Sequence, residues 1–203
     1  MTRITKPPQE RRKEILDAAL ELFINNGYAK TSVSDIVQKV NVAQGLFYYY
    51  FKSKEEVFLA AMEQYTDEFS AKLEAIIRDH TLPLIKRIEL IFVTMTQLFA
   101  QAEEALMEGI KYSEQLDLDF RLSIHVTQAL INPVSEVLEK TNEKGITQIK
   151  DPVATASFLV FGIFGLIHGN PEQLHNSHHL KLEEVVPLIA RVLNVSPELL
   201  LQL

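Results

Sequence analysis

The chain has 203 residues, of which 47% are hydrophobic and 23% are charged, a balance that excludes a mostly disordered protein. It contains no Cys, which excludes disulfides, thiolate metal ligands and a Cys nucleophile and leads us to expect a cytoplasmic protein. The net charge of −7 is unevenly distributed, because residues 1–54 carry +4 and residues 55–203 carry −11.

Neither a secretory signal nor a membrane span is expected. The first 14 residues have no apolar core. The longest apolar stretch, Val153–Ile167, is shorter than the roughly 20 residues that cross a bilayer. A basic head on an acidic body is compatible with nucleic-acid binding, since only the contacting face must neutralise phosphates. The alternative is that this uneven distribution of charge arose by chance and has no role in binding.

Four helices are predicted in the first third of the chain. Apolar residues recur at helical spacing from Glu10 to Asn26, where Asn-Gly ends the helix. Thr31-Ser32 offers an N-cap for a helix of about two turns, and Asn41 can adopt the left-handed conformation that ends it. A third short helix follows over Ala43–Tyr50, and Ser53 caps a fourth that runs to about residue 79.

The rest of the chain reads as a series of amphipathic helices. They are predicted over residues 83–101, 103–113, 118–142, 152–168 and 182–193, with a last short one from residue 197. Pro133 should bend the helix 118–142, because proline removes a helical hydrogen bond. No strand pattern is found, so the sequence predicts an all-α fold of about nine or ten helices. It would consist of an N-terminal three-helix head and a helical-bundle body.

The second and third helices have the spacing of a helix-turn-helix, over about residues 32–51, whose second helix reads base edges in the major groove. That helix contains five consecutive aromatic residues, Phe47–Phe51, which cannot all face inward. Packing accounts for Leu46, Phe47, Tyr50 and Phe51. It accounts less well for Gln44, Tyr48 and Tyr49, whose polar groups suit phosphates or bases.

The spacing of Gly45, Tyr48, Phe51 and Lys54 resembles the DNA-binding head of TetR-family transcriptional regulators. The run from Ile15 to Phe23, followed by Gly27-Tyr28, is similar to the first helix of that head. The resemblance covers about residues 10–60. It implies a DNA-binding head over 1–54 and a ligand-binding and dimerisation body over 55–203, linked by the helix of about residues 54–79.

The resemblance also implies which residues contact DNA: Thr31, Ser32, Gln44, Gly45, Tyr48, Tyr49 and Lys54. The two hydroxyls at the start of the second helix would bind phosphates, and the tyrosines would contact backbone and bases. Gly45 would permit close approach to DNA or close packing, and Lys54 would bind a phosphate with helix amides. Ala43 stands where the family often has a hydroxyl, so it receives no polar contact. The basic residues before residue 14 either add non-specific affinity or form a solvated start.

The segment around residues 157–167 is apolar on all sides, so both its own core and something else must cover it. We predict a dimer seam formed by this segment and the helix 182–193. Its residues would be Phe158, Phe161, Gly162, Gly165 and Ile189. TetR-family proteins similarly pair through their last two long helices. The alternative is a central core helix in a monomer.

Regulators of this family respond to small ligands in the body. The predicted pocket would be lined by Phe92, Met95, Phe99, Met107, Tyr112, Phe120, His125, Phe158 and Phe161. Such Phe and Met positions are more often ordinary core. A pocket of this composition implies a small lipophilic or aromatic effector.

A histidine cluster, His168, His175, His178 and His179, raises the hypothesis of a metal site. No two of them lie four residues apart on a predicted helix, because the cluster follows the end of the helix 152–168, and a solvated polar loop is the favoured interpretation. No metal or cofactor is therefore predicted.

The sequence predicts a ligand-responsive transcriptional regulator, most often a repressor in this family. It would bind a palindromic, inverted-repeat operator in double-stranded DNA as a homodimer and be released by a small molecule. No enzyme is predicted, because a glycine-rich phosphate loop, a nucleophile elbow and an HExxH motif are all missing from the sequence. A structural helical adaptor would leave the basic, tyrosine-rich head unexplained.

Overall fold

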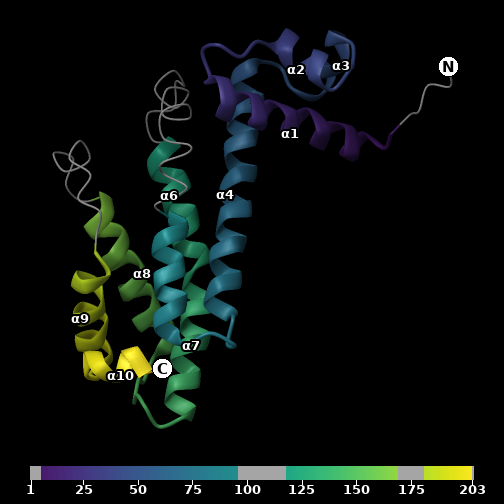
Figure 1. Cartoon of the computed structure of the whole chain (residues 1–203). Helices are drawn as coiled ribbons and strands as arrows, with labels where there is room; N and C mark the ends of the chain where they lie inside the picture. Colours follow the sequence, from purple (N-terminus) through teal and green to yellow (C-terminus); the bar gives the residue numbers. More distant parts are fainter. Residues whose placement is uncertain (1–5, 96–117, 169–180, 203) are drawn as a thin grey trace. The chain divides into compact units, whose positions relative to one another are not determined.

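The computed structural model describes residues 6–95, 118–168 and 181–202 (Figure 1). Every regular element in these ranges is an α-helix, which confirms the predicted all-α class. In the same ranges no helix is long and apolar enough to cross a membrane. The predicted helix 103–113 and the end of the predicted helix 83–101 lie outside the described residues.

Four helices form the N-terminal part: α1 (Pro8–Asn26), α2 (Val33–Lys39), α3 (Gln44–Tyr50) and α4 (Lys54–Arg78). Helix α1 begins at Pro8, two residues earlier than predicted. Proline fits the first helical position because the N–H that it lacks has no partner there. Gly27 ends α1 with φ 84°, in a conformation that favours glycine, and its N–H donates to the Phe23 carbonyl at 3.0 Å.

The chain divides into two compact units, and the division falls inside α4. One unit comprises Met1–Asp67 with Leu98–Leu122, and the other comprises Glu68–Gln97 with Ser123–Leu203. The sequence-based boundary at residues 54/55 therefore lies N-terminal of this division. Helix α4 runs without a break from Lys54 in the first unit to Arg78 in the second.

The first unit has a core built from the inner faces of α1 to α4. Its fully or almost fully buried members include Ile15, Ala19, Phe23, Ile36, Phe47, Phe51, Val57, Phe58 and Ala61. The rings of Phe23 and Phe58 meet edge to face with centroids 5.3 Å apart. Burying one such side chain contributes about 1.5–3 kcal/mol, so this core holds the short helices α2 and α3 in place.

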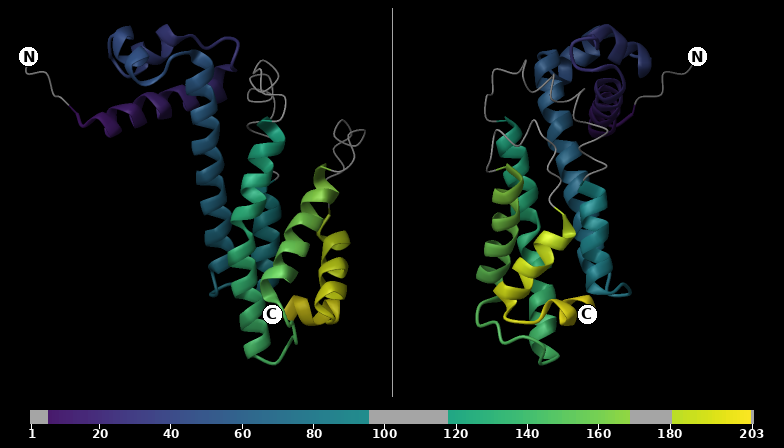
Figure 2. Two further views of the ribbon diagram at one scale, coloured as in Figure 1. Left: turned by 180° about the vertical axis from the view of Figure 1, so that it is seen from behind. Right: turned by 60° about the vertical axis from the view of Figure 1, so that its left-hand side comes forward.

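The second unit contains α7 (Ile131–Glu143), α8 (Pro152–His168), α9 (Leu182–Leu193) and α10 (Pro197–Gln202). A further helix, over residues 84–95, follows α4. Helix α8 lies between α7 and α9 and packs against both (Figure 2). The buried core residues here are Leu138, Ala156, Val186, Ala190, Leu193 and Leu200.

The predicted helix 118–142 is wrong as a single bent helix. The chain instead forms α6 (Leu118–Ala129) and α7 (Ile131–Glu143), which meet at Leu130. A proline ring clashes with the carbonyl four residues earlier, so Pro133 ends α6 at Ala129 rather than bending one helix. Pro133 then lies in the first turn of α7, where its missing N–H costs nothing.

Candidate nucleic-acid interface

The helix-turn-helix is formed by α2 and α3 and the turn between them. Asn41 has φ 53°, as the sequence predicts for the residue that ends α2. The turn is closed by the Val42 N–H, which donates to the Val37 carbonyl at 3.0 Å. Ile36 and Phe47 are fully buried and fix the inner faces of the two helices. The outer faces therefore have a defined position within the first unit.

Helix α3 separates its aromatic residues between core and surface. Phe47 and the following cap residue Phe51 are buried, whereas Tyr48 is 51% and Tyr49 is 75% exposed. The Tyr48 ring stands edge to face on Phe47 at 5.4 Å, and Tyr49 on Tyr50 at 4.9 Å. These contacts orient the two exposed rings.

Gln44 and Gly45 open the same helix and are also exposed. A Cβ atom built at Gly45 meets no atom within 4 Å, so close packing inside the chain is not what this glycine serves. The open space around Gly45 is compatible with the other expectation for this residue, which is close approach to DNA. Together with Tyr48 and Tyr49, these residues form a continuous polar face on α3.

Ser32 and Thr31 differ in what their hydroxyls do. Ser32 is exposed and caps α2: its Oγ accepts from the Asp35 N–H at 3.2 Å and donates to Asp35 Oδ2 at 2.7 Å. Hydrogen bonds from Ser32 stabilise the ionised form of Asp35 and lower the pKa of this carboxyl group. A phosphate contact by Ser32 requires only that its proton turns from Asp35 to the phosphate oxygen.

Thr31 is 1% exposed, and its hydroxyl donates to the Gly27 carbonyl at 2.9 Å. It also lies 3.2 Å from the Leu22 carbonyl. The structure therefore gives Thr31 partners inside the head, at the junction of α1 and α2. This placement differs from the phosphate contact that the resemblance implies, because a buried hydroxyl does not reach a phosphate.

Lys54 opens α4, and its ammonium group lies 4.1 Å from the centroid of the Tyr28 ring. The start of this helix is capped: the Glu56 N–H donates to Ser53 Oγ at 3.0 Å, and the Lys52 N–H donates to Glu56 Oε2 at 2.6 Å. A positive charge at a fixed helix N-terminus suits an anion. The Tyr28 contact could not be predicted, because no local pattern links residues so far apart in sequence.

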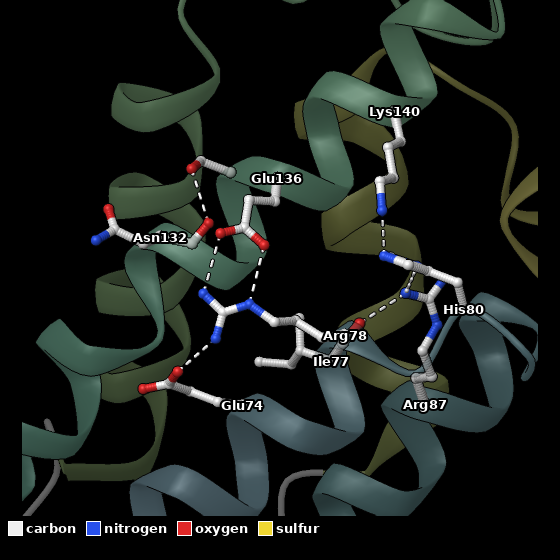
Figure 3. Close-up of polar contacts among 9 residues, drawn as sticks. Glu74, Ile77, Arg78, His80, Arg87, Asn132, Glu136 and Lys140 are labelled. Atoms are coloured by element: carbon white, nitrogen blue, oxygen red, sulfur yellow. Dashed lines mark hydrogen bonds and ion pairs between the residues drawn. The ribbon is translucent and has the colours of Figure 1, made fainter.

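The C-terminal end of α4 is tied to α7 within the second unit (Figure 3). The Arg78 guanidinium donates to both carboxylate oxygens of Glu136, at 2.9 Å from Nε and 3.0 Å from Nη2. Its Nη1 donates to Glu74 at 2.5 Å. The buried Arg87 donates to the Ile77 carbonyl at 2.7 Å. These bonds anchor the last turn of α4 in the body.

Of the five predicted seam residues, the four on α8 lie on an exposed face of that helix, whereas Ile189 on α9 does not. Phe158 is 67% exposed, and Phe161 and Leu166 are exposed as well. A Cβ atom at Gly162 or Gly165 meets nothing within 4 Å. On α9, Ile189 packs against the core, whereas Leu188 and Val192 are exposed. The sequence could have indicated Leu188 as well, since it lies four residues before Val192 on one helical face.

The predicted pocket is described only in part. Phe99, Met107 and Tyr112 lie outside the described residues, and the structure describes no side chain for Phe120. Phe92 and Met95 are half-buried, whereas His125 is exposed. The exposure of Phe158 and Phe161 suits the predicted seam better than an enclosed cavity. In the described part of the chain no cluster of metal-ligating side chains is found, and His175, His178 and His179 lie outside it.

Known proteins share both the head and the overall fold. Residues 15–61 match the family "Bacterial regulatory proteins, tetR family". The fatty acid metabolism regulator protein of Bacillus subtilis is 25% identical over 158 residues, which are 77% of this chain and 81% of that protein. The transcriptional repressor KstR2 of Mycolicibacterium smegmatis is 30% identical over 99 residues, 49% of this chain and 44% of that protein.

Among solved structures, a transcriptional regulator from Cytophaga hutchinsonii has the same fold. It superposes with a TM-score of 0.65 at 16% identity and covers 94% of this chain and 96% of its own. The matched residues 15–61 contain all the residues of the polar face on α3 and the start of α4. The helix-turn-helix head of this chain, over residues 15–61, is that of the TetR family of bacterial regulatory proteins, whose members are DNA-binding transcriptional regulators.

Proposed function

We propose that this regulator binds an inverted-repeat operator as a homodimer, represses transcription there, and is released by a small lipophilic molecule. The single observation that carries the proposal is the exposed tyrosine face of α3 on a rigid head. Tyr49 is 75% exposed although its neighbours Phe47 and Phe51 are buried, so its ring and its hydroxyl group are accessible to an external partner such as DNA.

The proposed DNA-contacting residues are Ser32, Gln44, Gly45, Tyr48, Tyr49 and Lys54. Ser32 and Lys54 lie at the N-termini of α2 and α4, where backbone amides add to a phosphate contact. Gln44 and the two tyrosines belong to α3, whose open face at Gly45 allows the helix to enter a major groove. Thr31 is left out of this set because its hydroxyl is buried.

The proposed dimer seam is the exposed apolar face of α8 and α9. It is formed by Phe158, Phe161, Gly162, Gly165, Leu166, Leu188 and Val192. Glycines on this face allow the backbones of two copies to approach closely. Two-fold pairing of helix-turn-helix heads matches an inverted repeat in the operator, since each head reads one half-site.

The proposed effector is a small lipophilic molecule of the fatty acid class. Two considerations support this class: the similarity to a Bacillus subtilis protein named for fatty acid metabolism, and the Phe- and Met-rich composition predicted for the pocket. The similarity to the repressor KstR2 supports repression as the direction of control.

Coupling between effector and DNA is proposed to pass through α4. This helix carries Lys54 at one end, and Arg78 ties its other end to α7. A ligand that shifts α7 or α4 therefore changes where Lys54 and the head lie. A coupling free energy of about 1–3 kcal/mol is enough to lower the affinity for DNA about 5- to 150-fold.

Selection of bound duplexes from a random DNA pool, at near-physiological salt, tests the proposal. Enrichment of an inverted repeat by the native protein but not by Tyr48→Ala is the expected result. Adding oleate to the complex should then release the DNA. If the folded protein enriches no duplex, the proposed DNA binding is wrong. If it enriches a single half-site, the proposed two-fold binding is wrong.

A further inference from the structure

Four basic residues lie in the described start of the head, and three of them are paired with carboxylates. Lys6 bonds to Glu14, Arg11 donates to the same carboxylate at 2.6 Å, and Lys13 donates to Asp17 at 2.9 Å. The fourth, Arg12, forms no ion pair with any described carboxylate and is exposed. It is thus the one cation among these four whose charge is not balanced by a neighbour within the described residues.

Arg12 lies against an aromatic ring instead. The carbon atom at the centre of its guanidinium group lies 4.8 Å from the centroid of the Phe51 ring. Phe51 is the C-cap residue of α3 and is 1% exposed, so this ring is a fixed part of the head core. A cation over an aromatic face is held electrostatically. The contact therefore places the Arg12 charge at the end of the helix proposed to read DNA.

The chemistry of the guanidinium group leaves this charge available to a ligand. Stacking uses the flat face of the group, whereas its N–H donors lie in its plane and form a fork that fits a phosphate. Side-chain ordering is part of the cost of any contact. Because the contact with Phe51 already restrains the Arg12 side chain, binding a phosphate costs less side-chain entropy.

The neighbourhood carries further groups suited to an anion. Lys52 follows Phe51 directly, is exposed, and its backbone is held by Glu56 at the capped start of α4. Lys54 follows on the first turn of that helix. The residues Phe51 to Lys54 thus join the end of α3 to the start of α4, and Arg12 adds a charge from α1 to the same segment.

From this geometry we infer that Arg12 is a DNA-binding residue, a phosphate contact that Phe51 holds in place beside α3. The inference rests on the proposed DNA binding by the head. It assigns to α1 a direct part in binding, beyond the contacts made by α2, α3 and α4. It also separates Arg12 from the paired cations Arg11 and Lys13, although the three are consecutive in sequence.

The salt dependence of binding to a fluorescent duplex of mixed sequence tests this inference. For each phosphate that the protein no longer neutralises, the slope of log affinity against log salt concentration falls by about 0.9. Arg12→Ala should lower the slope by this amount for each head that binds DNA and weaken binding uniformly across sequences. Lys13→Gln is the matched control, since the ammonium group that it removes is already paired with Asp17, and its slope should match that of the native protein.

Arg12→Lys distinguishes the fork from the charge alone: it should keep the salt slope of the native protein and still bind less tightly. Thermal unfolding of each variant, without DNA, verifies that the head remains folded. If the native protein shows no salt-dependent binding at all, the proposed function fails. A different outcome contradicts only the inference about Arg12: the native protein binds DNA and Tyr49→Ala weakens that binding, but Arg12→Ala changes neither the affinity nor the salt slope. The proposed function then stands.

Discussion

Two adjacent hydroxyls at the start of α2 have different physical roles. Thr31 donates inward to a backbone carbonyl of the α1–α2 junction, whereas Ser32 caps α2 at the surface. A buried donor that satisfies a buried acceptor contributes to stability, and its loss leaves that acceptor unpaired. An exposed cap contributes both to stability and to the surface that a ligand meets.

We therefore expect Thr31→Val to lower the free energy of unfolding by about 1–3 kcal/mol while the folded protein keeps its affinity for DNA. Ser32→Ala should cost about 0.5–2 kcal/mol of stability and also weaken DNA binding. Denaturant titration and fluorescence anisotropy with a labelled duplex measure the two effects separately. Loss of DNA affinity by folded Thr31→Val at unchanged stability contradicts this assignment.

His80 lies between two cations in the second unit (Figure 3). Its Nε2 contacts the Lys140 ammonium group, and its Nδ1 lies 3.4 Å from Nη1 of Arg87. Desolvation, followed by the positive charges of Lys140, Arg87 and Lys144, lowers the pKa of His80, and Asp79 opposes the shift. A neutral imidazole accepts a hydrogen bond from Lys140 in this position, whereas an imidazolium would face like charges.

The sign of the pH dependence follows from this lowered pKa. The unfolded chain binds a proton at His80 at a higher pH than the folded chain does, so stability is complete above about pH 6.5 and falls as the pH is lowered from there. His80→Gln keeps an acceptor for Lys140 but does not titrate. We expect the native protein to lose more stability than His80→Gln between about pH 7 and pH 5 in urea denaturation. Equal losses in the two proteins contradict the role given to His80.

At the scale of elements, the geometry of the helix-turn-helix depends on one left-handed residue. Asn41 has φ 53° between α2 and α3, in a region that costs other L-residues about 1–2 kcal/mol. Asparagine tolerates this conformation, and glycine adopts it without a steric penalty. The angle between the two helices is set by this turn and by the buried pair Ile36 and Phe47.

Asn41→Ala should therefore lower the free energy of unfolding by about 1–2 kcal/mol, and Asn41→Gly should change it much less. Thermal or denaturant unfolding of both variants, with circular dichroism as the probe, makes the comparison. Equal destabilisation by Ala and Gly would show that the asparagine side chain, rather than the backbone conformation, is what the turn requires.

The pattern of the head could be predicted from sequence because its signals are local. Helix caps, the left-handed Asn41 and the division of the aromatic residues of α3 each depend on neighbours within a few positions. The burial of Thr31 and the packing of Ile189 against the core could not be predicted, since both depend on contacts between elements. The break between α6 and α7 could not be predicted for a different reason. A proline such as Pro133 can either bend one helix or lie in the first turn of the next, and no local pattern distinguishes the two cases.

At the scale of the whole molecule, α8 and α9 expose several large apolar side chains among the described residues. Phe158 is 67% and Leu188 is 44% exposed, while α8 packs against α7 and α9 with its other faces. Large apolar side chains exposed together mark an interaction surface. Pairing of two copies over this face would bury them and would place two heads in one complex.

Phe158→Glu should therefore convert a dimer into a folded monomer, because a carboxylate cannot enter an apolar seam without a partner. Sedimentation at micromolar concentration gives the mass, and circular dichroism verifies the helix content. Lys150→Glu, an exposed charge reversal before α8, serves as the control and should remain dimeric. A Phe158→Glu protein that still sediments as a dimer rules out this face as the seam.

Two-fold binding to an inverted repeat can be tested by the mass of the complex that forms on a duplex enriched by the native protein. Native mass spectrometry counts the protomers bound to each duplex, with the intact inverted repeat compared to a version in which one half-site is scrambled. We expect two protomers for each intact repeat and a marked loss of binding on the scrambled one. One protomer for each duplex, or equal binding to both duplexes, contradicts this expectation.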